Sequence, residues 1–243
     1  MTDPKLKIYE SVDKVVEALA GEFASFASKK EKAGEKIFLA LSGGSTPQAL
    51  FKTLAEKYAS RINWRNIHFF WADERCVPPG DPESNYRSAN ELLLSRVGVP
   101  DKNIHRMRGE DSPEEEALRY ESVILSIVPL KYNIPRFDWI WLGMGDDGHT
   151  ASIFPDQLAL MYSDRICQTA IHPVTKQKRI TLTGKTLNHA RRVSFLVTGP
   201  AKTEISRIVL KETELRQKYP AAHVRPSEGE VDWYMDEAAT GAL

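Results

Sequence analysis

The side chains best suited to chemistry lie in one short segment, residues 143–150, which has the sequence GMGDDGHT. Asp147 stands two residues before His149, close enough to orient its imidazole, and the glycines allow a tight turn around the pair. An unperturbed histidine has a pKa of about 6.5 and can act as a base at neutral pH, while a neighbouring carboxylate fixes its tautomer and stabilises its cation. The pair is therefore a candidate for proton transfer.

Two other interpretations of this segment remain open. Asp147 could cap a helix beside a surface histidine, with no chemistry at all. Asp146, Asp147 and His149 could instead bind a metal ion, but the sequence has no second cluster of His or Cys to complete the ligand set. We therefore expect no metal site.

A glycine loop at residues 42–46, SGGST, is a candidate anion site. The loop comes directly after an apolar run and opens a helix, whose first N–H groups favour a bound anion. Its hydroxyls can donate hydrogen bonds, and its glycines allow a ligand to approach the backbone closely. Phosphate binding at Ser42, Gly43, Gly44 and Ser45 and an ordinary strand-to-helix turn are both consistent with this pattern, which matches neither common nucleotide-binding glycine motif.

Charged residues follow the next apolar run, where Asp73, Glu74 and Arg75 are adjacent. Such a triplet at the end of a buried strand is unfavourable unless it is paired or functional, although a solvated loop is the ordinary explanation. Further along the chain, Arg179 begins a strand-like run and Lys202 begins a helix. Either cation could bind a phosphate dianion or simply face solvent.

The remaining histidines and the two cysteines carry no comparable pattern. We expect the histidines to be structural or solvent-facing; they are His68, His105, His172, His189 and His223. Cys76 and Cys167 are far apart and form no C-x-x-C pair, so neither a disulfide framework nor a thiolate metal site is expected. The position of Cys76 beside Arg75 leaves a lowered thiol pKa open, but a half-buried free thiol is the simpler interpretation.

Alternating strand and helix patterns must position these residues. Short apolar runs at 37–41, 67–72, 137–142 and 193–197, with a more polar one at 179–183, predict strands covered on both faces. Helical spacing predicts helices at 11–30, 48–59, 90–97, 113–128 and 202–212, and Ser112, Pro113 and Glu115 predict a capped start for the fourth. Residues 219–243 predict only irregular structure with a short final helix. The alternation indicates an open, doubly wound, mostly parallel α/β sheet in one domain, residues 1–243.

Composition excludes several classes of protein. The 243 residues include 33 Lys plus Arg and 33 Asp plus Glu, so the formal net charge is zero and no nucleic-acid partner is expected. No apolar stretch approaches the ~18 residues of a membrane span, and residues 1–10 resemble no secretion signal, so we expect a cytoplasmic protein without a membrane partner. The sequence leaves monomer and dimer open.

Three segments together resemble the 6-phosphogluconolactonases, which share a superfamily with the glucosamine-6-phosphate deaminases. They are LSGGSTP at 41–47, WADER at 71–75 with SNY at 84–86, and LGMGDDGHTASIFP at 142–155. The resemblance extends from about Ile8 to Tyr234. It implies a Rossmann-like fold, no metal or organic cofactor, and hydrolysis of the small phosphorylated sugar lactone 6-phospho-D-glucono-1,5-lactone in the oxidative pentose phosphate pathway.

The resemblance also implies roles for individual residues. His149 would activate water with the support of Asp147, and the glycine loop, Arg179 and Lys202 would hold the substrate phosphate. Arg75 matches an arginine that contacts phosphate or sugar oxygen. Asp73 matches the aspartate that transfers protons in the deaminases, and in a lactonase it would orient a sugar hydroxyl or Arg75.

Two departures from the deaminase pattern favour lactone hydrolysis. Deaminases follow the histidine with IAFNEP, whose glutamate acts with the histidine, but the fifth residue after His149 is Phe154. Deaminases also tend to have DEY where this chain has Asp73, Glu74 and Arg75. A deaminase or isomerase of amino-sugar phosphates, and a sugar-phosphate-binding module without catalysis, remain the alternatives.

Overall fold

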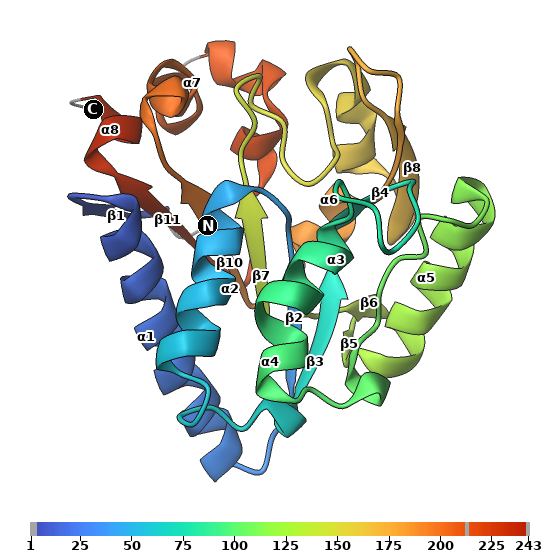
Figure 1. The fold of residues 1–243 in the computed structure, drawn as a ribbon. Coiled ribbons are helices and arrows are strands. Elements are labelled where there is room, and N and C mark those ends of the chain that lie inside the picture. Colours follow the sequence, from blue (N-terminus) through green and yellow to red (C-terminus); the bar gives the residue numbers. More distant parts are fainter. Residues whose placement is uncertain (1–3, 212–213, 242–243) are drawn as a thin grey trace.

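Parallel strands form the main sheet, as the sequence predicts (Figure 1). In this computed structural model, which describes residues 4–211 and 214–241, each strand pairs in parallel with its neighbours. The order of the six strands is β1 (Lys5–Tyr9), β11 (Glu230–Asp236), β10 (Arg192–Val197), β7 (Trp139–Gly143), β2 (Ile37–Leu41) and β3 (Ile67–Trp71). The fold class predicted from the alternation of strands and helices is confirmed.

Both faces of this sheet are covered, and β2 shows how its sequence achieves this. All five of its residues are buried, but Ile37, Leu39 and Leu41 pack in one core while Phe38 and Ala40 pack in the other. Successive side chains of a strand point to opposite faces, so a strand covered on both sides must be apolar throughout.

Helices cover the two faces as separate groups (Figure 1). One core is covered by α1 (Val12–Lys32), α2 (Ser45–Lys57) and a continuous helical segment made of α3 (Asn85–Ala89), a π-helical turn (Asn90–Leu94) and α4 (Ser95–Val97). The other is covered by α5 (Pro113–Ile127), α6 (Gly184–Leu187), α7 (Thr203–Leu210) and α8 (Glu237–Thr240). Short 3-10 turns lie at Trp64–Asn66, Asp101–Asn103, Pro155–Tyr162, Pro200–Lys202, Glu214–Lys218 and Pro220–His223.

The predicted helices are found, but their ends differ in informative ways. Ser11 caps α1, because its Oγ accepts a hydrogen bond from Lys14 N at 3.4 Å. Ser112 precedes α5 as predicted, yet its side chain makes no capping hydrogen bond, so the predicted capping interaction is wrong. The predicted end of the last long helix, at residue 212, lies outside the described residues.

A second sheet is antiparallel. It contains the charged triplet at residues 73–75 and most of the strand predicted at 179–183. It consists of β4 (Asp73–Arg75), β9 (Lys178–Leu182) and β8 (Cys167–Ile171), in that order. The strand predicted at 179–183 is therefore real but does not belong to the parallel sheet. Ala72 links the two sheets: its N–H donates to Leu41 O and its carbonyl accepts from Leu182 N, both at 2.7 Å. A small hairpin of β5 (Leu130–Lys131) and β6 (Ile134–Pro135) completes the strands.

The C-terminal segment corrects the sequence prediction most strongly. The short final helix is found as α8, but β11, in the segment expected to be irregular, is a fully paired strand inside the main sheet between β1 and β10. Asp232 interrupts its apolar run, and it is buried because Arg192 on the neighbouring strand pairs with it at 2.5 Å. Because this ion pair places a charged residue in the strand, the pattern of hydrophobic residues did not predict β11.

Strand order places a crevice between β2 and β7. From β2 the chain proceeds outward to β3, whereas β7, β10 and β11 extend in the other direction, so the connections diverge at the carboxyl ends of β2 and β7. Ligands of open α/β sheets bind at such switch points. The glycine loop follows β2 and the segment containing His149 follows β7, so the topology brings both to this crevice.

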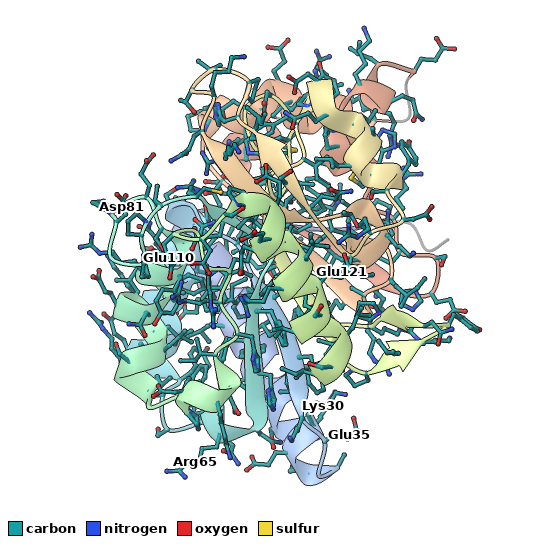
Figure 2. All side chains as sticks on the ribbon, turned by 90° about the vertical axis from the view of Figure 1, so that its right-hand side faces the viewer. Lys30, Glu35, Arg65, Asp81, Glu110 and Glu121 are labelled. Atoms are coloured by element: carbon teal, nitrogen blue, oxygen red, sulfur yellow. The ribbon has the colours of Figure 1, made fainter. Side chains whose placement is uncertain are left out.

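A small ion-pair cluster lies at the opposite end of the main strands. Lys30 Nζ lies 2.7 Å from Glu35 and 2.9 Å from Asp138, close to where β2 and β7 begin. Lys30, Glu35 and Arg65 mark this end in Figure 2.

Among the described residues, every helix is too short or too polar to span a membrane. The cytoplasmic location stays a prediction.

Candidate active site

A pocket of about 240 Å³ occupies the crevice between the carboxyl ends of β2 and β7. Nine of the ten residues predicted for the site line it, and the tenth, Asp147, lies behind His149. These nine come from five separate stretches of the chain: Ser42, Gly43, Gly44, Ser45, Asp73, Arg75, His149, Arg179 and Lys202.

The glycine loop is shaped by what packs against it. A Cβ on Gly43 would lie 1.8 Å from Asn85 Oδ1, so only glycine fits there. Gly44 has a φ of 109° at the start of α2, a conformation that glycine adopts without strain. Ser42 Oγ is buried and has no hydrogen-bond partner among the described residues. The loop therefore presents a free hydroxyl and the N-terminus of α2 to the pocket.

Two arginines face each other on the antiparallel sheet. Arg75 on β4 is directly opposite Arg179 on β9, and like charges in such a pair repel. Arg179 is only 7% exposed, and burial together with the charge of Arg75 lowers the pKa of its guanidinium. Both Nε atoms are buried without a partner among residues 4–211 and 214–241. An anion in the pocket would relieve the repulsion and use the free donors.

Asp73 lies on the same face of that sheet, two residues before Arg75. It is 7% exposed, and its carboxylate accepts hydrogen bonds from Ser152 Oγ at 2.7 Å and from Asn85 Nδ2 at 3.4 Å. Arg75 instead donates from Nη1 to Glu83 O at 2.7 Å. The structure therefore fixes Asp73 through two neutral donors rather than through the arginine.

Glu74 positions its neighbours and does not line the pocket. Its carboxylate accepts hydrogen bonds from the N–H groups of Arg75, Asn85 and Tyr86 and from the hydroxyl of Ser84. Burial raises the pKa of this carboxyl, and the three N–H donors oppose that rise. Glu74 thus holds the start of α3 against β4, which sets the position of Arg75.

His149 and Asp147 form the pair expected from their spacing. The imidazole Nδ1 lies 2.5 Å from Asp147 Oδ1, which also accepts the His149 N–H at 3.1 Å. Burial favours a higher pKa for Asp147, but the hydrogen bonds and charge of His149 outweigh it and lower the pKa below its ordinary value. A Cβ on Gly145 would lie 2.1 Å from Nδ1, so this glycine makes room for the ring. A carboxylate oxygen accepts, so Nδ1 is the donor of this hydrogen bond.

Lys202 contacts the segment that contains His149. Its Nζ donates to Asp146 Oδ1 at 2.5 Å, and Asp146 is mostly exposed. The two aspartates are therefore engaged separately, Asp146 by a lysine and Asp147 by a histidine. The described residues contain no cluster of three or more His, Cys, Asp or Glu side chains arranged to hold a metal ion.

Some pocket residues had not been predicted. His172 lines the pocket, which corrects the expectation that it is structural or solvent-facing. Asn85 and Ser152 lie inside the segments that carry the family resemblance, so their position in those segments was an available signal. Thr46 and Thr198 join the glycine loop to the end of β10 through hydroxyls 2.7 Å apart, a contact that no local pattern indicates.

Both cysteines are free, as expected. Burial raises the pKa of Cys76 to about 11 despite the nearby cations Arg179 and Lys178. Burial also raises the pKa of Cys167. Neither thiol lines the pocket or has the lowered pKa of a nucleophile.

The fold and the site together define an α/β protein with a histidine–carboxylate pair and a cluster of cations at the switch point of its sheet. Residues 10–233 match the family described as glucosamine-6-phosphate isomerases/6-phosphogluconolactonase. The chain belongs to this family, which confirms the resemblance found in its sequence.

Individual relatives are similar to this chain over nearly their whole length. The 6-phosphogluconolactonase of Haemophilus influenzae is 41% identical over 236 residues, which are 97% of this chain and 98% of the relative. The crystal structure of 6-phosphogluconolactonase from Thermotoga maritima is 34% identical with a TM-score of 0.82, covering 97% of this chain and 100% of that one. The 6-phosphogluconolactonase structure from Trypanosoma brucei is 27% identical with a TM-score of 0.87, and both chains are covered completely.

Proposed function

We propose that this chain is a hydrolase that converts 6-phospho-D-glucono-1,5-lactone to 6-phospho-D-gluconate in the oxidative pentose phosphate pathway. Its relatives, similar over the full chain, support the substrate and the reaction class. The observation that carries the proposal is His149, whose Nδ1 is bonded to Asp147 while its ring lines a pocket rich in unpaired cationic donors.

His149 is the general base of this proposal. Its Nε2 removes a proton from a water molecule as the water oxygen attacks the lactone carbonyl carbon. Asp147 stabilises the resulting imidazolium, which then returns the proton to the ring oxygen as the C–O bond breaks. General acid–base help of this kind contributes ~10²- to 10⁴-fold to the rate. The lactone carbonyl is already electrophilic, so positioning supplies much of the remainder.

The phosphate of the substrate is held by the glycine loop, Arg179 and Lys202, with Arg75 beside Arg179. The arginines carry unpaired Nε donors, and α2 begins directly after Gly44. Lys202 exchanges the exposed carboxylate of Asp146 for the phosphate when substrate arrives. Binding energy at the phosphate then holds the lactone carbon near His149, because a remote anchor orients the reacting end.

Asp73 is assigned to a sugar hydroxyl. Ser152 and Asn85 occupy part of its hydrogen-bonding capacity and fix its orientation, and a carboxylate has further lone pairs to accept a hydroxyl proton from a ligand. No contact with Arg75 competes for it in the described residues. This role replaces the proton transfer that the matching aspartate performs in the deaminases.

Phe154 favours hydrolysis over deamination. Its ring lies 4.8 Å from the His149 ring, centroid to centroid, and its side chain is buried. An apolar ring therefore packs against His149 where the deaminase pattern has an acid, so no second proton-transfer group stands there.

Lactone disappearance above the spontaneous rate tests the proposal. We expect rapid loss of 6-phosphogluconolactone and much slower loss of unphosphorylated gluconolactone, measured side by side by acid release at constant pH. Ammonia release from glucosamine 6-phosphate, or binding of phosphosugars without any turnover, would contradict it.

A further inference from the structure

The ring of His172 is held in one orientation and one tautomer. Its Nδ1 accepts hydrogen bonds from the backbone N–H groups of Val174 and Thr175, both at 3.2 Å. A nitrogen that accepts two N–H donors cannot carry a proton, so the proton of the neutral ring is on Nε2. Nε2 has no hydrogen-bond partner in the part of the chain that the structure describes. His172 thus presents a single unused donor.

The antiparallel sheet places this donor beside the arginines. Ala170 on β8 is opposite Arg179 on β9, and Arg179 is opposite Arg75 on β4. His172 directly follows β8 and continues its pairing, because its N–H donates to Gln177 O at 2.9 Å. Side chains two residues apart on an extended chain share a face, so His172 lies on the same face as both arginines, one step diagonally from Arg179. All three residues line the pocket.

Phe154 fixes the other side of the ring. Its centroid lies 5.1 Å from that of His172 in an edge-to-face arrangement and 4.8 Å from that of His149. The buried phenyl ring therefore separates two imidazoles with different partners, a carboxylate for His149 and backbone N–H groups for His172.

We propose that His172 is a specificity-determining residue, whose neutral Nε2–H donates a hydrogen bond to the phosphate end of the substrate. This inference rests on the function proposed above and assigns a further phosphate contact to it. The chemistry of the position favours a neutral donor, since a third cation beside Arg75 and Arg179 would add to a repulsion already present. Burial, followed by the charge of Arg179, lowers the pKa of His172, which is consistent with a neutral ring.

A substitution by asparagine separates the two hydrogen-bonding roles of this side chain. In His172→Asn the amide oxygen can accept the Val174 and Thr175 N–H groups, as asparagine does in turns, while the donor at Nε2 is lost. We expect KM for 6-phosphogluconolactone and the Kd for 6-phosphogluconate to rise about tenfold, the usual effect of one hydrogen bond to a charged group. The change in kcat is expected to be smaller than that in KM, and binding of gluconate is expected to change little.

The matched control is Val174→Ala on the same turn, because Val174 is 81% exposed and lies outside the pocket lining. The inference is overturned if His172→Asn leaves phosphorylated ligands unaffected, if it weakens gluconate and 6-phosphogluconate equally, or if Val174→Ala has the same effect. Calorimetric binding of 6-phosphogluconate needs no turnover. A wild-type protein that binds this acid but hydrolyses no lactone would therefore contradict the proposed function while leaving His172 testable.

Discussion

Two regions of the molecule contain an imidazole hydrogen-bonded to a titratable partner, and the partners differ. His149 bonds to the carboxylate of Asp147 at the carboxyl end of β7. His68, on β3, lies 3.0 Å from His105, Nδ1 to Nε2, with their rings parallel within 2° and flanked by Phe38 and Phe70. The first imidazole therefore faces a carboxylate, and the second faces another imidazole.

Physical setting accounts for the difference. A carboxylate stabilises an imidazolium, whereas a second imidazole and two phenyl rings do not. Burial and then the neighbouring His68 lower the pKa of His105 to about 4, and burial lowers that of His68. A histidine becomes a useful base through a charged partner and access to a ligand; His68 and His105 have only each other and do not line the pocket.

Removing the proposed base gives the largest expected effect. His149→Ala should reduce kcat about 10³-fold, within the range of general base catalysis. The variant should still bind 6-phosphogluconate, because the phosphate contacts remain, and calorimetry checks this. His105→Phe serves as the control and should retain wild-type kcat. Near wild-type turnover in His149→Ala would mean that His149 is no more a catalytic base than His105 is.

The carboxylate is the next test. Asp147→Asn keeps the size of the side chain but removes the charge that stabilises the imidazolium, so we expect kcat to fall about 10²-fold. Steady-state kinetics measure it, and an unchanged melting temperature would show that the fold persists. A loss below threefold would mean that Asp147 only holds the loop.

Arginine substitution tests the charge that surrounds the proposed base. Arg179→Gln should raise KM for 6-phosphogluconolactone about 10- to 100-fold, because a charge-assisted hydrogen bond contributes about 1.5–3 kcal/mol. Lys202→Ala should act in the same direction. Neither variant should alter the slow hydrolysis of unphosphorylated gluconolactone to the same degree, and an unchanged KM in both would place the phosphate elsewhere.

The smallest effect is expected at the histidine pair and concerns stability. The pKa of His105 is about 4 in the folded chain and about 6.5 when unfolded, so the unfolded chain binds more protons between these values. Stability is therefore full above pH ~6.5 and is lost as the pH falls toward ~4. Partial exposure reduces this loss to about 1 kcal/mol between pH 7 and pH 5.

His105→Phe should remove that part of the pH dependence, measured by urea unfolding at both pH values. His149→Ala is the matched comparison and should leave it intact. The same slope in wild type and His105→Phe would show that other groups govern the acid response.

Local patterns in the sequence predicted what lies close along the chain. The pairing of Asp147 with His149 follows from a separation of two residues, and the glycine loop follows from its position between a strand and a helix. The opposition of Arg75 and Arg179 could not be predicted, because it depends on the register of antiparallel strands about a hundred residues apart. The place of His172 could not be predicted for the same reason, because its turn brings it to the pocket only when β8 and β9 pair.

Elements with mixed polarity were the ones missed. β11 carries Asp232, whose burial makes sense only beside Arg192, and β1 alternates lysines with apolar residues in the manner of a sheet edge. The alternation of strand and helix patterns thus predicted the fold class, and the ion pair between Asp232 and Arg192 accounts for the strand that this pattern missed.

The placement of β11 also constrains how this chain reaches its native state. In the described residues β1 has one neighbour in the main sheet, β11. Lys7 on β1 donates a hydrogen bond to the hydroxyl of Tyr234 on β11, 227 positions further along the chain. Domains fold as units during synthesis, and contacts between distant segments form slowly. β1 can therefore take its place in the sheet only after β11 has been synthesised, so this edge of the sheet depends on an intact C-terminal segment.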